Sequence, residues 1–240
     1  MAEKVLTKSG GKISGDLTTT LLAAALLSSL GSSMLYGYNL AVVNSPAQYI
    51  KDFYNRTAAR RNGSGLSTDS ITVFYSITVS IFAIGGLVGS LTVGMLVTKF
   101  GRYCTMLKST FLVFVAGGLM GLSRHIGVPE MIIIGRFITG IHSGISLSVV
   151  PMFLEDIAPK NLRGFLGLVP SIFICIGVFI AQIFGLNKVL GKEQHWPLLL
   201  SLMVVPTFIQ LMLLPWFPYL LIEKHNIHAT LNGSEDPAES

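Results

Sequence analysis

The chain has 240 residues, of which 51% are hydrophobic and only 12% are charged, and its mean hydropathy is +0.64. A soluble domain usually carries about 25% charged residues, so this composition excludes an ordinary water-soluble protein and requires that most of the surface contact lipid. The net charge of +5 does not indicate a nucleic-acid partner, because the basic residues are spread singly along the chain without a basic stripe.

Six apolar runs follow one another, each long enough to cross a hydrocarbon core of roughly 30 Å as a helix. They are predicted at Thr19–Val43, Ile71–Val97, Cys104–Leu122, Met131–Leu154, Gly164–Leu186 and Trp196–Phe217. All acidic residues lie outside these runs, and the only basic residues inside them are Lys108 and Arg136. Because a charge at the bilayer centre costs about 2.5–3.5 kcal/mol on insertion scales, this division predicts an all-α membrane protein with six transmembrane helices.

Polar segments flank this six-helix domain of residues 19–218. We expect residues 1–18 to form a cytoplasmic N-terminal segment. We expect residues 219–240 to form a polar cytoplasmic tail without fixed structure, because its end, NGSEDPAES, has no apolar pattern. Basic loop residues do not fix the orientation, since a cytoplasmic N-terminus places similar numbers of them on the two sides.

Glycosylation acceptor sequences favour a cytoplasmic N-terminus. Asn55-Arg56-Thr57 and Asn62-Gly63-Ser64 both lie in the loop after the first predicted helix. Use of either one would place that loop outside the cytoplasm. A third match, Asn232-Gly233-Ser234, falls in the predicted cytoplasmic tail, and we expect it to be unused.

Small residues recur at four-residue spacing in three of the predicted helices: Gly85, Gly89, Gly86, Ser90 and Gly94; Gly140 and Gly144; Gly177, Ala181 and Gly185. Such stripes let neighbouring transmembrane helices approach closely. They fit the sliding helix faces of a transporter, and they equally fit a tight bundle with no moving parts. The first and fourth helices also share a pattern of small residues, paired valines and a proline, as two three-helix units of inverted topology would produce.

No catalytic or metal-binding constellation stands out in the sequence, so we expect neither an enzyme nor a cofactor. The candidate functional groups are polar side chains inside apolar runs. Tyr36 lies in the first predicted helix. Ser171 and Gln182 are 11 positions apart in the fifth and therefore share one face. That face either lines a cavity or holds the bundle together through hydrogen bonds between helices.

Charged residues near the ends of the predicted helices form a second set of candidates. Arg136 either snorkels to the interface or pairs with an acid at the cytoplasmic mouth, and the adjacent Gly135 favours pairing because it leaves room for a neighbouring backbone. Arg102, in a short glycine-containing loop, can cap a helix C-terminus or pair with a carboxylate. Asp156 and Arg163 either belong to a charge cluster that closes the inner side or are solvated loop charges.

With these residues in view, the chain resembles the facilitative hexose transporters, the sugar-porter branch of the major facilitator superfamily. The resemblance spans nearly the whole chain in the family's order and is carried by GSSMLYGYNLAVVNSP, FGRY, IIIGRFITG, PMFLEDIAPKNLRG, GVFIAQIFGL, WPLLL and LLPWFP. The forms YGYN and APKNLRG are most similar to the class that transports fructose or urate. Only the N-terminal half of the family's fold is covered, in which six helices form a 3+3 inverted repeat.

The resemblance implies passive alternating-access transport of a hexose (fructose or glucose) or of urate across the plasma membrane, without a cofactor. It implies that Tyr36, Ser171, Ile174 and Val178 face the sugar path, and Gln182 shares the face of Ser171. It also implies a cytoplasmic charge network that stabilises the outward-facing state, made of Arg102, Arg136, Asp156 and Arg163. Asn55 matches the family's glycosylated loop position.

Four departures from the family pattern matter. Ser171 stands where sugar-selective members usually carry a glutamine, which favours a substrate less like glucose. Tyr103 stands where the family has a second basic residue. The family's Pro-Glu-Ser-Pro-Arg motif after the sixth helix is not present, because Phe217-Pro218 is followed directly by Tyr219-Leu220-Leu221-Ile222. The sequence also stops at Ser240, so we expect a truncated hexose transporter that is incomplete alone. The alternatives are a non-transporting isoform that pairs with a full-length transporter and regulates it, and a half-transporter that pairs with itself.

Overall fold

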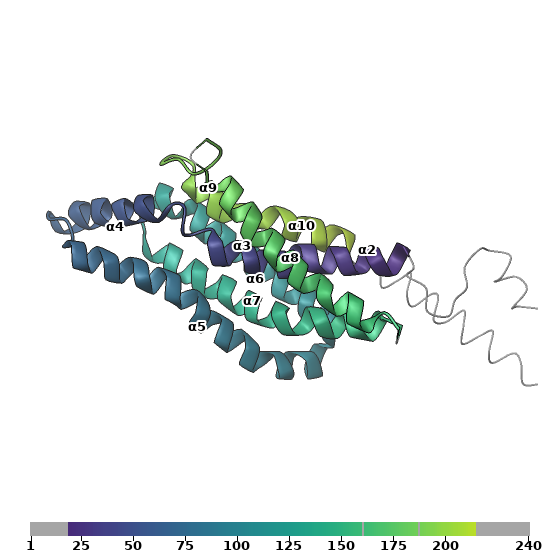
Figure 1. The fold of residues 1–240 in the computed structure, drawn as a ribbon. Coiled ribbons are helices and arrows are strands. Elements are labelled where there is room, and N and C mark those ends of the chain that lie inside the picture. The colour runs from purple at the N-terminus through teal and green to yellow at the C-terminus, as the bar shows by residue number, and fades with distance from the viewer. Residues whose placement is uncertain (1–18, 160, 187, 215–240) are drawn as a thin grey trace, which may run out of the picture.

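A computed structural model describes residues 19–159, 161–186 and 188–214 (Figure 1). The first span consists of α2 (Thr19–Ser28), the π-helix η1 (Ser29–Ser33) and α3 (Met34–Ala41). It is followed by α4 (Ala47–Asn62), α5 (Thr68–Phe100), α6 (Arg102–Ile126), α7 (Glu130–Ile157) and α8 (Arg163–Phe184). The last span is divided into α9 (Trp196–Ser201) and α10 (Val204–Leu213).

Six helical segments of the described chain are long and apolar enough to cross a membrane, which confirms the predicted all-α architecture of six transmembrane helices. They are Leu21–Ala41, Thr68–Phe100, Arg102–Ile126, Glu130–Ile157, Arg163–Phe184 and Trp196–Leu213. Three helices run several residues beyond the predicted apolar runs, because polar residues at their ends remain helical. The predicted segments 1–18 and 219–240, and the acceptor Asn232, lie outside the described residues.

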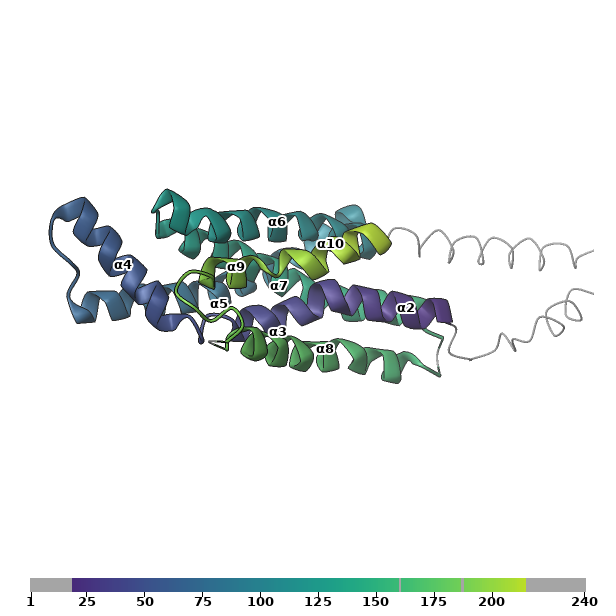
Figure 2. The same cartoon turned by 90° about the horizontal axis from the view of Figure 1, so that it is seen from above.

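Helix α4 is the element that apolar runs did not predict. It projects beyond the bundle at one end, here called the α4 end (Figure 2). Ile50, Tyr54 and Thr57 recur at helical spacing and are buried against the other helices, whereas Arg60 and Arg61 are exposed in its last turn. Gly63 ends the helix with a left-handed φ of 75°.

The spans pack in a pattern that relates the first three to the last three. The first span packs on α8, and the fourth span, α7, packs on α5. The first span also contacts the sixth span, between η1 and α10, and the fourth span, α7, likewise contacts the third span, α6. Each contact therefore has a counterpart when the two three-helix units exchange roles, which supports the inverted repeat.

Backbones touch where α5 packs on α7. A methyl group on Gly140 would overlap the carbonyl oxygen of Phe82, and one on Gly89 would overlap that of Ile141. These positions belong to the predicted stripes of small residues. Gly94 belongs to the same predicted set but has no atom of a neighbouring segment within 4 Å of its Cβ position, so it is not a packing glycine.

The equivalent contact between α3 and α8 is built in the same way. A methyl group on Gly37 would overlap the carbonyl oxygen of Ile174, and one on Gly177 would overlap that of Met34. Helices in lipid gain no hydrophobic energy by associating, so close van der Waals packing between small residues must hold them together. These two glycine contacts therefore fix how α3 packs on α8 and how α5 packs on α7.

The π-helix in the first span was not predicted. Met34 donates its backbone N–H to Ser29, five residues earlier, which widens one turn. Gln210 of α10 reaches into this region, where its Nε2 donates to Ser32 Oγ at 2.9 Å and to the carbonyl oxygen of Ser28 at 3.3 Å. The Gln210 side chain thereby joins the first and last spans.

Replacing Gly144 with leucine should destabilise the bundle, because its Cβ position overlaps the carbonyl oxygen of Gly86. Overpacking of this kind costs about 1–3 kcal/mol. The measurement is the thermal unfolding midpoint in detergent. Gly94→Leu is the matched control and should leave the midpoint nearly unchanged; equal losses in the two variants would contradict the packing described here.

Candidate functional site

The polar residues of α8 lie on a stripe that borders its contact with α3. Ser171 and Gln182 are exposed on this stripe, and Val178, between them, is partly buried. The neighbouring stripe, which includes Gly177 and Ala181, is buried. The structure thus keeps the two predicted polar residues on one open face of α8. Ile174 is partly buried, and its carbonyl oxygen lies against α3.

Tyr36 lies on another side of the same first span. Its ring stacks on Phe82 of α5, with 6.1 Å between the ring centroids. The predicted path residues therefore lie in two places: Tyr36 is on the side of α3 that faces α5, and the others are on α8, which packs on a different side of α3. Whether they contact one ligand together stays a prediction.

Three of the four residues predicted for the charge network lie at one end of the bundle, opposite the α4 end. Arg102 forms an ion pair with Asp156 and also donates to the carbonyl oxygen of Met152 at 2.9 Å. Arg163 Nε donates to the carbonyl oxygen of Ala158 at 3.4 Å. These contacts tie the start of α6 and the start of α8 to the end of α7.

The placement of Arg136 in this network is wrong. Arg136 and Asp156 are 20 positions apart on the same helix, which at about 1.5 Å per residue separates them by roughly 30 Å. Arg136 is instead buried in the bundle, 1% exposed. Its Nη1 donates to the backbone oxygen of Asn39 at 2.7 Å, and its guanidinium lies 4.4 Å from the ring centroid of Phe82. The arginine therefore joins α7 to α3 and α5.

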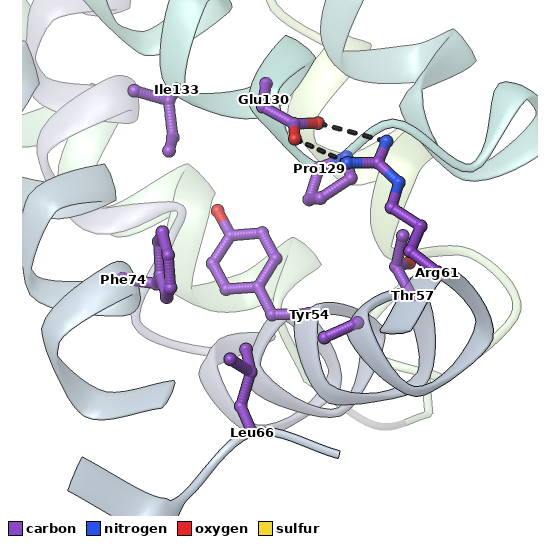
Figure 3. A pocket seen from close by; sticks show the side chains of 9 residues that line it. Tyr54, Thr57, Arg61, Leu66, Phe74, Pro129, Glu130 and Ile133 are labelled. Atoms are coloured by element: carbon purple, nitrogen blue, oxygen red, sulfur yellow. Dashed lines mark hydrogen bonds and ion pairs between the residues drawn. The ribbon is translucent and has the colours of Figure 1, made fainter. Parts of the chain in front are cut away.

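A pocket of about 180 Å³ lies under α4, between it and the ends of α5 and α7. Figure 3 shows the ring of Tyr54 between Phe74 on one side and the Arg61–Glu130 ion pair on the other. The two nitrogens of Arg61 lie 2.6 and 3.4 Å from the Glu130 oxygens. Both side chains of the pair are about half exposed, so it orients α4 more than it stabilises the fold.

Tyr54 is the buried anchor of this pocket. The hydroxyl of Thr78 donates to the carbonyl oxygen of Phe74 at 2.8 Å, so the Tyr54 hydroxyl donates to Thr78 Oγ1 at 2.6 Å. Burial raises the pKa of Tyr54 to about 12, so the hydroxyl remains a hydrogen-bond donor even at alkaline pH. Together with the ion pair of Arg56 and Glu193 at 2.6 Å, these contacts hold α4 across the end of the bundle.

Asn55 lies on α4 and is partly buried. Its Oδ1 accepts the backbone N–H of Leu66 at 2.9 Å. The Nδ2 atom, to which a glycan would be attached, has no hydrogen bond to the described residues. The geometry is compatible with glycosylation, which stays a prediction.

Several buried polar atoms of the first span and of α7, two spans that contact each other, lack a hydrogen-bond partner within the described residues. They are Ser29 Oγ, Ser33 Oγ and Asn39 Oδ1 of the first span, and Arg136 Nε and Ser143 Oγ of α7. Buried polar groups are normally paired, and each exception calls for a partner such as water or a ligand. These two spans therefore carry buried polar groups that could bind water or a polar ligand.

Sequence reasoning missed Phe82, Gln210 and the anchoring role of Tyr54. Gln210 could have been found, because it is a lone amide inside an apolar run. Phe82 carried no signal, since an aromatic residue in a transmembrane helix is ordinary. Within the described residues, no group of three or more His, Cys, Asp or Glu side chains is placed to hold a metal ion.

Residues 24–237 match the family described as "Sugar (and other) transporter". The chain is 51% identical over 221 residues to human solute carrier family 2, facilitated glucose transporter member 9, a match that covers 90% of this chain and 41% of that protein. It is 48% identical over 226 residues to horse member 5, covering 92% and 45%. The inward-open xylose transporter XylE from E. coli shares the fold with a TM-score of 0.69 at 22% identity, covering 81% of this chain and 47% of that one. The chain thus spans about two fifths of the length of the curated relatives it matches.

Arg136→Lys should lower the unfolding midpoint in detergent. Lysine lacks the planar group that lies on Phe82 and also bonds Asn39, and a hydrogen bond to a charged group contributes about 1.5–3 kcal/mol. Arg163→Lys, at an exposed position, is the control and should change the midpoint little. Equal effects would contradict the buried role of Arg136.

Expression in mammalian cells should give a glycosylated chain whose glycan is lost in Asn55→Gln. The measurement is the electrophoretic mobility before and after endoglycosidase treatment. Asn232→Gln should leave the mobility unchanged. A glycan that persists in Asn55→Gln and disappears in Asn232→Gln would reverse the predicted orientation.

Proposed function

The chain belongs to the Sugar (and other) transporter family, and from that premise we propose that it forms one wall of a passive path for a hexose or a related small polar solute. The relatives it matches are named facilitated transporters, which supports movement down a gradient by alternating access. The proposed location is the plasma membrane, with the N-terminus in the cytoplasm.

The open polar stripe on α8 carries this proposal. Ser171 and Gln182 are exposed on a helix whose other exposed side chains include Phe165, Leu168, Ile172 and Phe179. Polar groups that face hydrocarbon are unfavourable, and those inside transmembrane segments mark solute pathways. A stripe that is polar while its neighbours are apolar therefore fits a solute path on one side and lipid on the other.

The polar interface between the first span and α7 gives independent support. Its unpaired hydroxyl and amide groups are the kind that water or a sugar can satisfy when the path opens. Family transporters hold their substrate near the bilayer midplane between two six-helix halves, and the first and fourth spans are equivalent members of the two three-helix repeats of this half.

The substrate we propose is of the fructose or urate type. The serine at position 171, in place of the glutamine of sugar-selective members, is shorter and leaves more room beside α3. The name of the relatives refers to glucose; the forms YGYN and APKNLRG connect this chain to the class that transports fructose or urate.

The contacts at the two ends of the bundle fit alternating access. We propose that the Arg102–Asp156 pair, with Arg163 beside it, forms the cytoplasmic gate of this half. The α4 end would then face the outside. Because the chain covers about two fifths of its relatives, the second wall would come from further residues of the same protein or from a partner chain.

A polypeptide of residues 1–240 alone should not equilibrate labelled fructose in proteoliposomes, because half of the binding shell is missing. Co-reconstitution with the second half of horse member 5 should restore saturable uptake of fructose or urate. Gln182→Ala should raise KM about 3- to 10-fold, which corresponds to the loss of one hydrogen bond.

Phe179→Ala, an exposed apolar position on the same helix, is the matched control and should leave KM unchanged. Uptake by the complex that responds equally to the two substitutions would contradict the polar stripe as a path wall. Saturable uptake by residues 1–240 alone would contradict the requirement for a second wall.

A further inference from the structure

A groove of about 240 Å³ lies between the first, fifth and sixth spans, away from the polar stripe. Its walls are apolar and include Met34 and Tyr38 of α3, Ile180 and Phe184 of α8, and Leu202 and Ile209 of the sixth span. The tyrosine does not make the groove polar, because its hydroxyl donates to the carbonyl oxygen of Leu199 at 2.6 Å. A ligand in this groove would meet hydrocarbon on every side.

The groove lies beside a break in the sixth span. Proline has no N–H, so Pro206 cannot donate to the carbonyl oxygen of Leu202, four residues earlier. Val205 donates to that oxygen instead, at 3.1 Å, and Leu202 donates to Leu199 at 3.4 Å. These shorter turns separate α9 from α10, and the side chains on either side of the break line the groove.

The mouth of the groove opens on an apolar surface. Val205 and Ile209 are exposed at its edge on α10, and Ile183 is exposed on α8. Because these helices are membrane spans, the medium at this mouth is bilayer hydrocarbon. An empty groove would forfeit van der Waals contacts along all its walls, whereas a flexible hydrocarbon chain can follow its shape.

Basic residues lie in the loop that follows a wall residue of the groove. Phe184, a wall residue, is the last residue of α8, and the loop that follows carries Lys188 and Lys192, both exposed. Figure 2 shows this loop between α8 and α9 at the end of the bundle where α3 ends. The acidic residue of the loop, Glu193, is paired with Arg56 at 2.6 Å, which leaves the loop net positive. The backbone N–H of Leu190 donates to the carbonyl oxygen of Phe184 at 3.1 Å, so this loop folds back onto the end of α8 at a wall of the groove.

We propose that this groove holds one acyl chain of a membrane phospholipid and that Lys188 and Lys192 bind its phosphate. The apolar walls accept the chain, and the two ammonium groups, on long side chains that reach the membrane interface near the helix end, complement the anionic phosphate of the head group. The site is separate from the polar stripe of α8 and does not depend on the proposed transport.

Native mass spectrometry of the 240-residue chain, extracted in a mild detergent, tests the site. The wild-type chain should retain one phospholipid. Ile180→Trp and Leu202→Trp fill the groove from opposite walls, and each should reduce the retained fraction at least about fivefold. Leu198→Trp, at an exposed position of α9 outside the lining, is the matched control and should retain the lipid.

The double variant Lys188→Gln/Lys192→Gln tests the phosphate contacts. It should retain several-fold less phospholipid than the wild-type chain, at an unchanged elution volume.

A photoreactive phospholipid with a diazirine in its acyl chain tests the wild-type chain directly. Crosslinks should concentrate in peptides that contain Ile180–Phe184 and Leu202–Ile209, and they should exceed those on the exposed Phe111 and Val115 of α6. Equal labelling of α6, or full retention of lipid in both tryptophan variants, would overturn the groove as a lipid site. Unchanged retention in the double lysine variant would overturn the assignment of the phosphate.

Discussion

Backbone contact at two pairs of helices holds this bundle together. Gly37 and Gly177 bring α3 against α8, and Gly140 with Gly89 brings α7 against α5. In lipid, apolar side chains gain nothing by leaving their surroundings, so the close approach that glycine permits supplies the cohesion. The two contacts are equivalent under exchange of the three-helix units, so one packing solution is used twice.

These contacts decide what the remaining faces can do. The stripe of α8 that contains Gly177 and Ala181 packs on α3. The neighbouring polar stripe with Ser171 and Gln182 therefore stays exposed, and the apolar side with Leu168 and Phe179 faces lipid. The first span and α7 lie at the centre, where Arg136 reaches Asn39 and Phe82. One end is covered by α4 through Tyr54 and two ion pairs, and the other is tied by Arg102 and Asp156. The two ends of the bundle are therefore held by separate sets of contacts, which can break independently of each other.

Periodicity and charge exclusion predicted the spans well, because a bilayer imposes a length and an apolar composition that can be read without tertiary information. Most of the predicted glycine stripes also proved to be helix contacts, but Gly94 has no neighbouring segment near it, so the spacing of small residues alone does not show which of them pack against another helix. Helix α4 was missed because it is polar and lies outside the apolar runs. Arg136 was misplaced because a sequence shows that a charge is inside a span but not which depth or neighbour it has. The contact of Gln210 with the first span, and the groove between three spans, join segments far apart in the sequence, which no local pattern reports.

Disulfide trapping between the ends of the first span and α8 tests their packing most directly. A Cβ at Gly185 would lie 2.6 Å from that of Ser45, about 1 Å inside the usual separation for a disulfide. Because Ser45 lies in the turn after α3, a small outward shift of that turn reaches disulfide geometry, so Ser45→Cys/Gly185→Cys should crosslink on oxidation in membranes once Cys104 and Cys175 are replaced. A protease site placed in the loop between α7 and α8 would then give fragments that stay joined until reduction. Gly121→Cys/Ser201→Cys, whose Cβ positions are 3.5 Å apart between α6 and α9, is the positive control. Crosslinking of the control pair without crosslinking of Ser45→Cys/Gly185→Cys would contradict the packing of the first span on α8.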